Sequence, residues 1–128
     1  MKKLIFILIT ILIGNEIFAS ELIFKPEKAK IGDTINVIYS GNLRFDNKKS
    51  IDLVYYIFDE NSSFAKGYEA NLIKNNDKWF GKFVVPHNSA YILFKIFVAQ
   101  DNIDIIDNNL GNYWDLLIYE GDKPTRNA

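Results

Sequence analysis

Residues 91–98, YILFKIFV, decide how this chain folds. A single charged residue, Lys95, interrupts an otherwise apolar run. Because successive side chains of a β-strand point to opposite faces, Lys95 marks the outer face and its sequence neighbours mark the inner one. The segment therefore predicts a strand with one buried face, formed by Ile92, Phe94, Ile96 and Val98.

Six further runs along the chain show apolar residues with the same period of two. They are ELIFK (21–25), TINVIYS (34–40), IDLVYYIF (51–58), EANLIK (69–74), KWFGKFVV (78–85) and YWDLLIY (113–119). Turn-forming residues bound these runs, and the intervening segments, including QDNIDIIDNNLGN (100–112), are expected to be connections. Short strands at this spacing, without helical periodicity, predict an all-β antiparallel sandwich of about seven strands rather than a barrel or an α/β sheet.

Charged residues assign the faces of three more strands in the same way. Lys82, Asp52 and Asp115 each mark an outer face. The predicted inner residues are Trp79, Phe83 and Val85, then Ile51, Leu53, Tyr55 and Ile57, and finally Trp114, Leu116 and Ile118. The predicted outer residues are Phe80, then Val54, Tyr56 and Phe58, and finally Tyr113, Leu117 and Tyr119.

Residues 1–19 have the features of a bacterial secretory signal peptide. Lys2 and Lys3 precede ten residues, 4–13, that are apolar except for Thr10, and the small residue Ala19 follows. We expect cleavage after Ala19, a single domain over residues 20–128, and export to the periplasm or the extracellular space. The alternative is an uncleaved N-terminal anchor, which would be the chain's only membrane contact. Since the chain has no cysteine, it has no disulfide and no acylated-cysteine lipid anchor.

The charge balance speaks against nucleic acid as a partner. The chain has 15 Lys and Arg and 16 Asp and Glu, and removal of residues 1–19 leaves 13 and 15. Nucleic-acid binding normally requires a strongly basic face. Seven Tyr and ten Phe are more than one small core is expected to hold, so some aromatic residues should lie at the surface and form contacts.

The segment DNNLGNYW, residues 107–114, has three interpretations. In the first, Asp107, Asn108 and Asn109 close a tight corner by hydrogen-bonding backbone groups, and Gly111 supplies the positive φ that starts the last strand. Alternatively, the amide of Asn108 or Asn109 binds sugar hydroxyls beside Tyr113, because an amide both donates and accepts hydrogen bonds. A third interpretation is a calcium site, because the carboxylates of Asp101, Asp104 and Asp107 recur every three residues.

The outward aromatic residues also have two interpretations. If their strands are neighbours in one sheet, Tyr56, Phe58 and Phe80 form an apolar strip, and contiguous exposed apolar surface usually marks an interaction site. Alternatively, the segment SSFAKGY (62–68) covers that strip with Phe64 and Tyr68.

The series KWFGKFVVP, YILFKIFV and DNNLGNYW resembles the second half of starch-binding modules of carbohydrate-binding families 25 and 53. The chain is also similar to the immunoglobulin-like domain that precedes periplasmic thioredoxin-like proteins of Bacteroidetes, through LVYYIFDEN and YEGDKP. Both resemblances imply an immunoglobulin-like sandwich of the E-set type. The chain departs from the first family at Ile105 and Ile106, where an additional tryptophan is common, and from the second in having no cysteine for redox chemistry.

Nothing in the sequence predicts an enzyme, a cofactor or a metal-based reaction centre. His87 is the only histidine, and the adjacent carboxyl residues Asp59 and Glu60 should point apart on a strand end. Two function hypotheses remain. The first is a non-catalytic module that binds a starch-like or other polysaccharide through Tyr56, Phe80, Asn108, Asn109 and Tyr113. The second is a structural or protein-interaction domain of the cell envelope.

Overall fold

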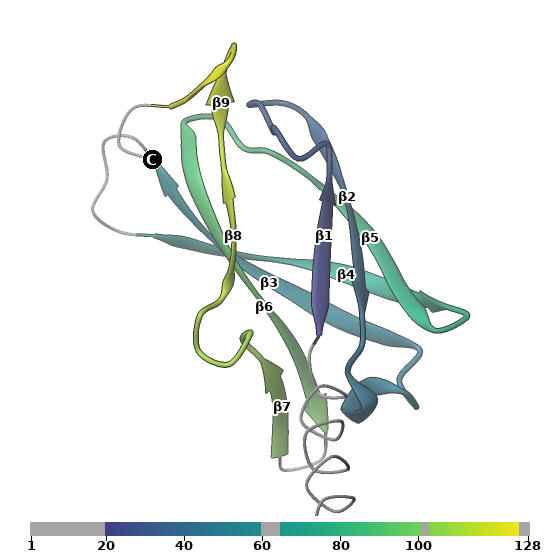
Figure 1. Cartoon of the computed structure of the whole chain (residues 1–128). Coiled ribbons are helices and arrows are strands. Elements are labelled where there is room, and N and C mark those ends of the chain that lie inside the picture. Colours follow the sequence, from purple (N-terminus) through teal and green to yellow (C-terminus); the bar gives the residue numbers. More distant parts are fainter. Residues whose placement is uncertain (1–19, 60–64, 101–102, 126–128) are drawn as a thin grey trace, which may run out of the picture.

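The computed structural model describes residues 20–59, 65–100 and 103–125 (Figure 1). The predicted signal peptide, residues 1–19, lies outside the described residues, as do Glu60, Phe64 and Asp101. Within the described ranges, no helix has the length and apolar character needed to cross a membrane.

Almost all of the described structure is β, as predicted. The strands are β1 (Glu21–Lys25), β2 (Thr34–Ser40), β3 (Ser50–Asp59), β4 (Lys66–Asn75), β5 (Lys78–Val84), β6 (Ser89–Gln100), β7 (Ile103–Asp107), β8 (Trp114–Leu117), β9 (Tyr119–Glu120) and β10 (Lys123–Pro124). One short 3-10 helix, η1 (Leu43–Phe45), follows β2.

The main sheet is antiparallel, and its strand order is β1-β2-β5-β4-β3-β6-β7, with β8 also paired to β6. The sheet curls so that β1 and β8 come to the same side of the molecule (Figure 1). Ala29 and Ile118 form a parallel bridge there, and the backbone N–H of Tyr119 donates to the carbonyl of Ala29 at 2.8 Å. The architecture is therefore a sandwich that approaches a closed barrel, whereas the sequence predicted a sandwich rather than a barrel.

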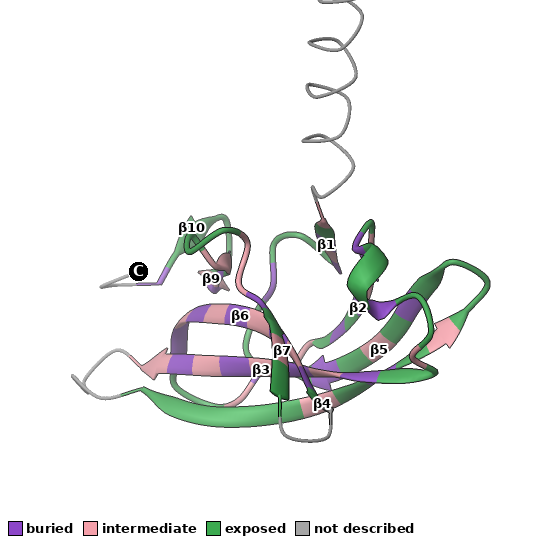
Figure 2. Cartoon of the chain, turned by 90° about the horizontal axis from the view of Figure 1, so that it is seen from below, coloured by how far each residue is buried: buried purple, intermediate pink, exposed green. Residues whose placement is uncertain are grey.

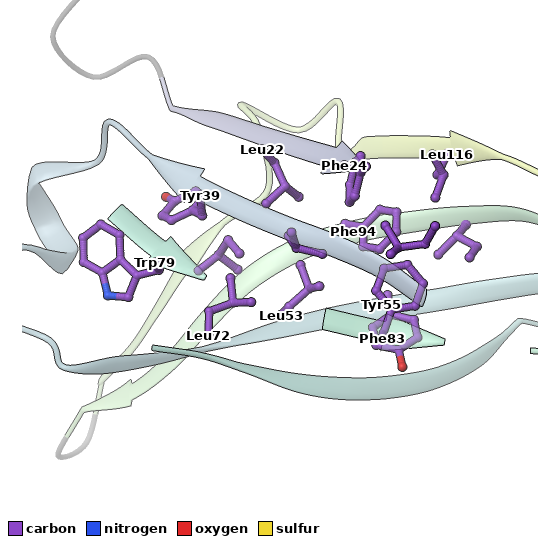
Figure 3. Packing of buried hydrophobic residues seen from close by; sticks show 14 of the residues in the cluster. Leu22, Phe24, Tyr39, Leu53, Tyr55, Leu72, Trp79, Phe83, Phe94 and Leu116 are labelled. Carbon is purple, nitrogen blue, oxygen red and sulfur yellow. The ribbon is translucent and has the colours of Figure 1, made fainter. Parts of the chain in front are cut away.

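The hydrophobic core lies between the inner faces of the curled sheet (Figure 3). Figure 2 shows the alternation of buried and half-buried residues as stripes along β3 and β6. The predictions from Lys95, Lys82 and Asp52 are confirmed. The buried residues include Ile51, Leu53, Tyr55, Ile57, Trp79, Phe83, Val85, Ile92, Phe94, Ile96 and Val98.

Two details of the last strands differ from the prediction. Trp114 is only half-buried, because it packs at the margin of the core, edge-on to Tyr39 with ring centroids 6.1 Å apart. Residues 103–107, predicted to be part of a connection, form β7. Asp107 occupies an inward position of β7, opposite the buried Ile96. A carboxylate at an inward position removes the apolar alternation by which a strand is recognised.

Gly81 is the one inward position on β5 where a side chain does not fit. A Cβ atom there would collide with Leu72 of β4 and would lie 2.8 Å from the carbonyl oxygen of Asn71. We expect Gly81→Ala to lower the free energy of unfolding by about 1–3 kcal/mol, as overpacking of a core typically does. Urea unfolding of the two proteins measures this difference.

Gly67 on β4 provides the matched control, because a Cβ there would lie 3.6 Å from the Tyr56 ring, at ordinary contact distance. Gly67→Ala should change stability by no more than about 0.5 kcal/mol. Equal effects of the two substitutions would contradict the close approach of β4 and β5 at Gly81.

Candidate functional site

The segment 108–113 forms a loop that leaves the main sheet between β7 and β8. Asp107 pairs with Ile96 of β6, and Trp114 pairs with Phe94 of the same strand. Lys95 alone therefore lies opposite six residues, so β7 and β8 are two parts of one strand interrupted by a large bulge. We call residues 108–113 the bulge loop.

Side-chain amides fold the bulge loop by bonding its own backbone. The carbonyl oxygen of the Asn108 side chain accepts from the N–H of Gly111 at 2.9 Å, and the Asn109 amide donates to the Tyr113 carbonyl at 3.1 Å. The N–H of Tyr113 donates to the Asn108 carbonyl at 2.8 Å. Asn109, Leu110, Gly111 and Tyr113 all have positive φ, a conformation that asparagine and glycine tolerate best. The hydrogen bonds of Asn108 and Asn109 to the loop backbone therefore agree with the interpretation of this segment as a corner.

Asp107 anchors the start of the bulge loop from inside the protein. Its Oδ2 accepts hydrogen bonds from Ser20 at 2.5 Å, from the Tyr39 hydroxyl, and from the Asn42 amide at 3.1 Å. Its Oδ1 accepts from the N–H of Asn109 at 3.0 Å. The donors lie far apart in sequence, so the carboxylate ties Ser20, the end of β2 and the bulge loop together.

Hydrogen bonding keeps Asp107 ionised although it is buried. Burial by itself would raise the pKa of this carboxyl, but the hydrogen bonds from Ser20, Tyr39, Asn109 and Asn42 outweigh burial and lower the pKa below its ordinary value. Burial, and then the neighbouring Asp107, raises the pKa of the Tyr39 hydroxyl far above its ordinary value.

Arg44 reinforces the same cluster from η1. Its Nη2 donates to the carbonyl of Ile106 at 3.1 Å, and its Nε and backbone N–H both donate to Asn42 Oδ1, at 3.3 and 3.0 Å. Sequence reasoning did not predict this cluster. Its members are far apart in sequence, and the only signal was a carboxylate at an inward strand position.

Tyr56 and Phe80, the other two predicted sugar contacts, lie on the outer face of the sheet, away from each other. Tyr56 of β3 is half-buried opposite Gly67, and Phe80 of β5 lies opposite Ile73. Gly67 and Ile73 are both on β4, six residues apart, so these two positions lie about 20 Å apart along the strand. The predicted strip of Tyr56, Phe58 and Phe80 is therefore wrong.

The predicted cover of that strip is also wrong where it can be tested. Tyr68 belongs to β4 and turns to the inner side, where its ring stacks on Tyr55 with centroids 5.6 Å apart. The other predicted cover residue, Phe64, lies outside the described residues. Lys95 lies over the ring of Tyr56, and its Nζ is 5.4 Å from the ring centroid.

A different set of outer side chains forms a continuous apolar row across four strands. Ile23 of β1 pairs with Ile38 of β2, Ile38 with Phe80 of β5, and Phe80 with Ile73 of β4. Phe80 is 40% exposed and Ile73 is 55% exposed. We call Ile23, Ile38, Phe80 and Ile73 the apolar row. Only the strand order brings these four residues together, so the sequence revealed just one of them, Phe80.

A calcium site would require carboxylates that point to a common centre, and the side chains of Asp104 and Asp107 do not. Asp104 is exposed on one face of β7 and Asp107 is buried on the other, since residues three apart on a strand face opposite ways. The third candidate, Asp101, is not among the described residues. In the described part of the chain, no group of three His, Cys, Asp or Glu residues is placed to hold a metal ion.

The structure thus gathers Asn108, Asn109 and Tyr113 in the bulge loop and places Tyr56 and Phe80 elsewhere. Comparison of the chain with protein-family models, curated proteins and solved structures finds no match in any of the three.

Proposed function

We propose that the chain is an exported, non-catalytic binding module of immunoglobulin-like architecture, which docks another protein of the bacterial envelope. Export is supported by the signal-like residues 1–19. The strand order β1-β2-β5-β4 and β3-β6-β7 supports the immunoglobulin-like assignment, because it corresponds to the ABED and CFG sheets of that fold. Here β3 and β4 are themselves paired, which joins the two sheets into one.

The apolar row is the observation that carries the docking function. It spans four neighbouring strands, and its two residues on β4 and β5 leave about half of their surface in water. Isolated exposed apolar residues are ordinary, whereas a contiguous set is typical of an interaction surface. A partner that covers Phe80 and Ile73 would remove this apolar area from water, which favours association.

The charges beside the apolar row indicate the chemistry of the partner. The outer positions next to it include the exposed residues Lys25, Lys82 and Lys78, and one acidic residue, Glu21. A second copy of this chain would bring lysines toward lysines, which opposes association. A different protein, with carboxylates around an apolar patch, is complementary to this surface.

Site-specific photo-crosslinking in the producing cells tests this proposal. With p-benzoylphenylalanine in place of Phe80, we expect one discrete adduct to a second protein. The adduct should weaken several-fold when Lys25→Glu and Lys82→Glu are added. The same probe in place of Phe97, a half-buried residue on the outer face of β6, provides the control. An adduct only to the chain itself, or equal labelling from both positions, would refute the proposal.

The bulge loop supports a second candidate function, the binding of a starch-like polysaccharide. Its support is that Asn108, Asn109 and the half-buried Tyr113, three of the five predicted sugar contacts, lie in one loop. Native gels containing soluble starch or glycogen distinguish the two candidates. Retardation that is lost in Tyr113→Ala and retained in Phe80→Ser would favour the polysaccharide, and the reverse pattern would not fit a bulge-loop site.

A further inference from the structure

A groove separates β1 from β8 on the side where the two ends of the curled sheet meet. Its volume is about 290 Å³, and its lining comes from both strands and from the turn after β1. Figure 3 shows Leu22, Phe24 and Leu116 along one side of the core, above Phe94. The residues that line the groove are Leu22, Ile23, Phe24, Glu27, Asp115 and Leu116.

Both strands beside the groove are edge strands. In the described ladders, β1 pairs with β2 alone and β8 pairs with β6 alone. Among the described residues, the two sides are bridged at Ala29 and Ile118, beyond the ends of both strands. An edge strand presents backbone N–H and C=O groups that another strand can bond. The groove is therefore flanked by two rows of backbone groups.

The direction of the two strands decides how a further strand would fit between them. The bridge between Ala29 and Ile118 is parallel, so β1 and β8 run the same way, as Figure 1 shows. A segment that runs opposite to both would form an antiparallel ladder on each side. Addition of an extended peptide to a sheet edge is an established mode of peptide recognition, in which backbone hydrogen bonds give affinity and side-chain pockets give specificity.

We propose that this groove binds an extended peptide segment of a partner protein, in which apolar and basic residues alternate. Leu22, Phe24 and Leu116 are buried residues on the inner face, so every second side chain of the segment would rest on apolar surface. Asp115 and Glu27 are exposed at the rim, so the intervening side chains would lie beside carboxylates. A groove of about 290 Å³ is at the small end of ligand sites, which suits a few aliphatic side chains but not a helix.

The groove and the apolar row can be tested separately, although they share one residue. Ile23 belongs to both surfaces, but Phe80 and Ile73 lie on β5 and β4, away from the groove. Substitutions at Phe80 and at Asp115 therefore distinguish the two sites.

The test uses residues 20–128 and the synthetic peptide acetyl-Lys-Val-Lys-Val-Lys-Val-Lys-amide as probe. We expect saturable binding and slower amide hydrogen exchange in β1 and β8. A peptide of the same sequence with alternate backbone nitrogens methylated should bind at least about tenfold more weakly, because it lacks the donors for one ladder. The acidic analogue, with glutamate in place of lysine, should also bind more weakly.

Variants of the protein complete the test. Asp115→Lys should weaken binding of the basic peptide about three- to tenfold, since the rim charge is exposed and contributes modestly. Asp115→Asn should give a smaller loss. Asp77→Lys, in the exposed turn between β4 and β5, is the matched charge control, and it should leave binding unchanged, as should Phe80→Ser.

Equal binding of the methylated peptide, or exchange protection confined to β4 and β5, would overturn the proposal, as would the absence of saturable binding.

Discussion

Phe94→Ala is expected to lower the free energy of unfolding by about 3–5 kcal/mol, the range typical of phenylalanine truncation in a core. Phe94 is fully buried at the centre of the aromatic cluster. Its ring centroid lies 4.4 Å from that of Phe24, 5.6 Å from that of Phe83 and 6.0 Å from that of Tyr55. These neighbours come from three other strands, so no single strand can move to fill the cavity. Urea unfolding of residues 20–128 measures the loss.

Phe97→Ala is the matched control for this prediction. Phe97 lies on the same strand as Phe94 but is half-buried on the outer face, opposite Asp52. Its truncation removes the same atoms and leaves no closed cavity, so the loss should be clearly smaller. A single domain is stable by only about 5–15 kcal/mol, so the Phe94 variant should also unfold at markedly lower urea concentration. Similar losses for the two variants would contradict the assignment of faces on β6.

Asp107→Ala is expected to destabilise the protein by about 3 kcal/mol, because each buried donor left without an acceptor costs roughly 1–3 kcal/mol. The Tyr39 hydroxyl, the Asn42 amide and the N–H of Asn109 all donate to this carboxylate. Water that enters the space can satisfy some of them, which limits the total. Thermal or urea unfolding at neutral pH measures the effect, and exposed Asp104→Ala on the same strand is the control.

The stability that Asp107 contributes should depend on pH in a defined direction. Its pKa is lower in the folded protein than its ordinary value, so folding favours the ionised form. The contribution is complete above the ordinary aspartate pKa of about 4 and is lost as the pH falls through the lower folded pKa. The difference in stability between the parent and Asp107→Asn should therefore shrink on acidification. A constant difference between pH 7 and pH 3 would contradict an ionised, hydrogen-bonded Asp107.

Local pattern predicted the strand faces because alternation is a property of the chain itself. Lys95, Lys82 and Asp52 each sit between apolar neighbours, and the buried sets assigned from them are confirmed. The same reasoning did not find β7, because the carboxylate at its inward position 107 is stabilised by donors from residues 20, 39 and 42. Partners so far away in sequence leave no local signal.

In the candidate site, too, local features followed from the sequence and contacts between strands did not. One of the three interpretations of residues 107–114 was a corner, because Asn108, Asn109 and Gly111 are residue types that favour positive φ and short side-chain hydrogen bonds. The sequence did not indicate that Phe80 lies opposite Ile38 and Ile73 while Tyr56 lies opposite Gly67. Register depends on pairing between strands, and the residues of one strand do not specify which strand will be its neighbour.

The sequence alone therefore determined the all-β class, most strand positions and the inward face of the central strands, because these follow from the alternation of polar and apolar residues along the chain. Only the tertiary structure decided the order of the strands, the apolar row, the buried Asp107 cluster and the groove between β1 and β8. Each of these depends on contacts between distant segments. Such contacts form when the sheet curls and brings its first and last strands to the same side.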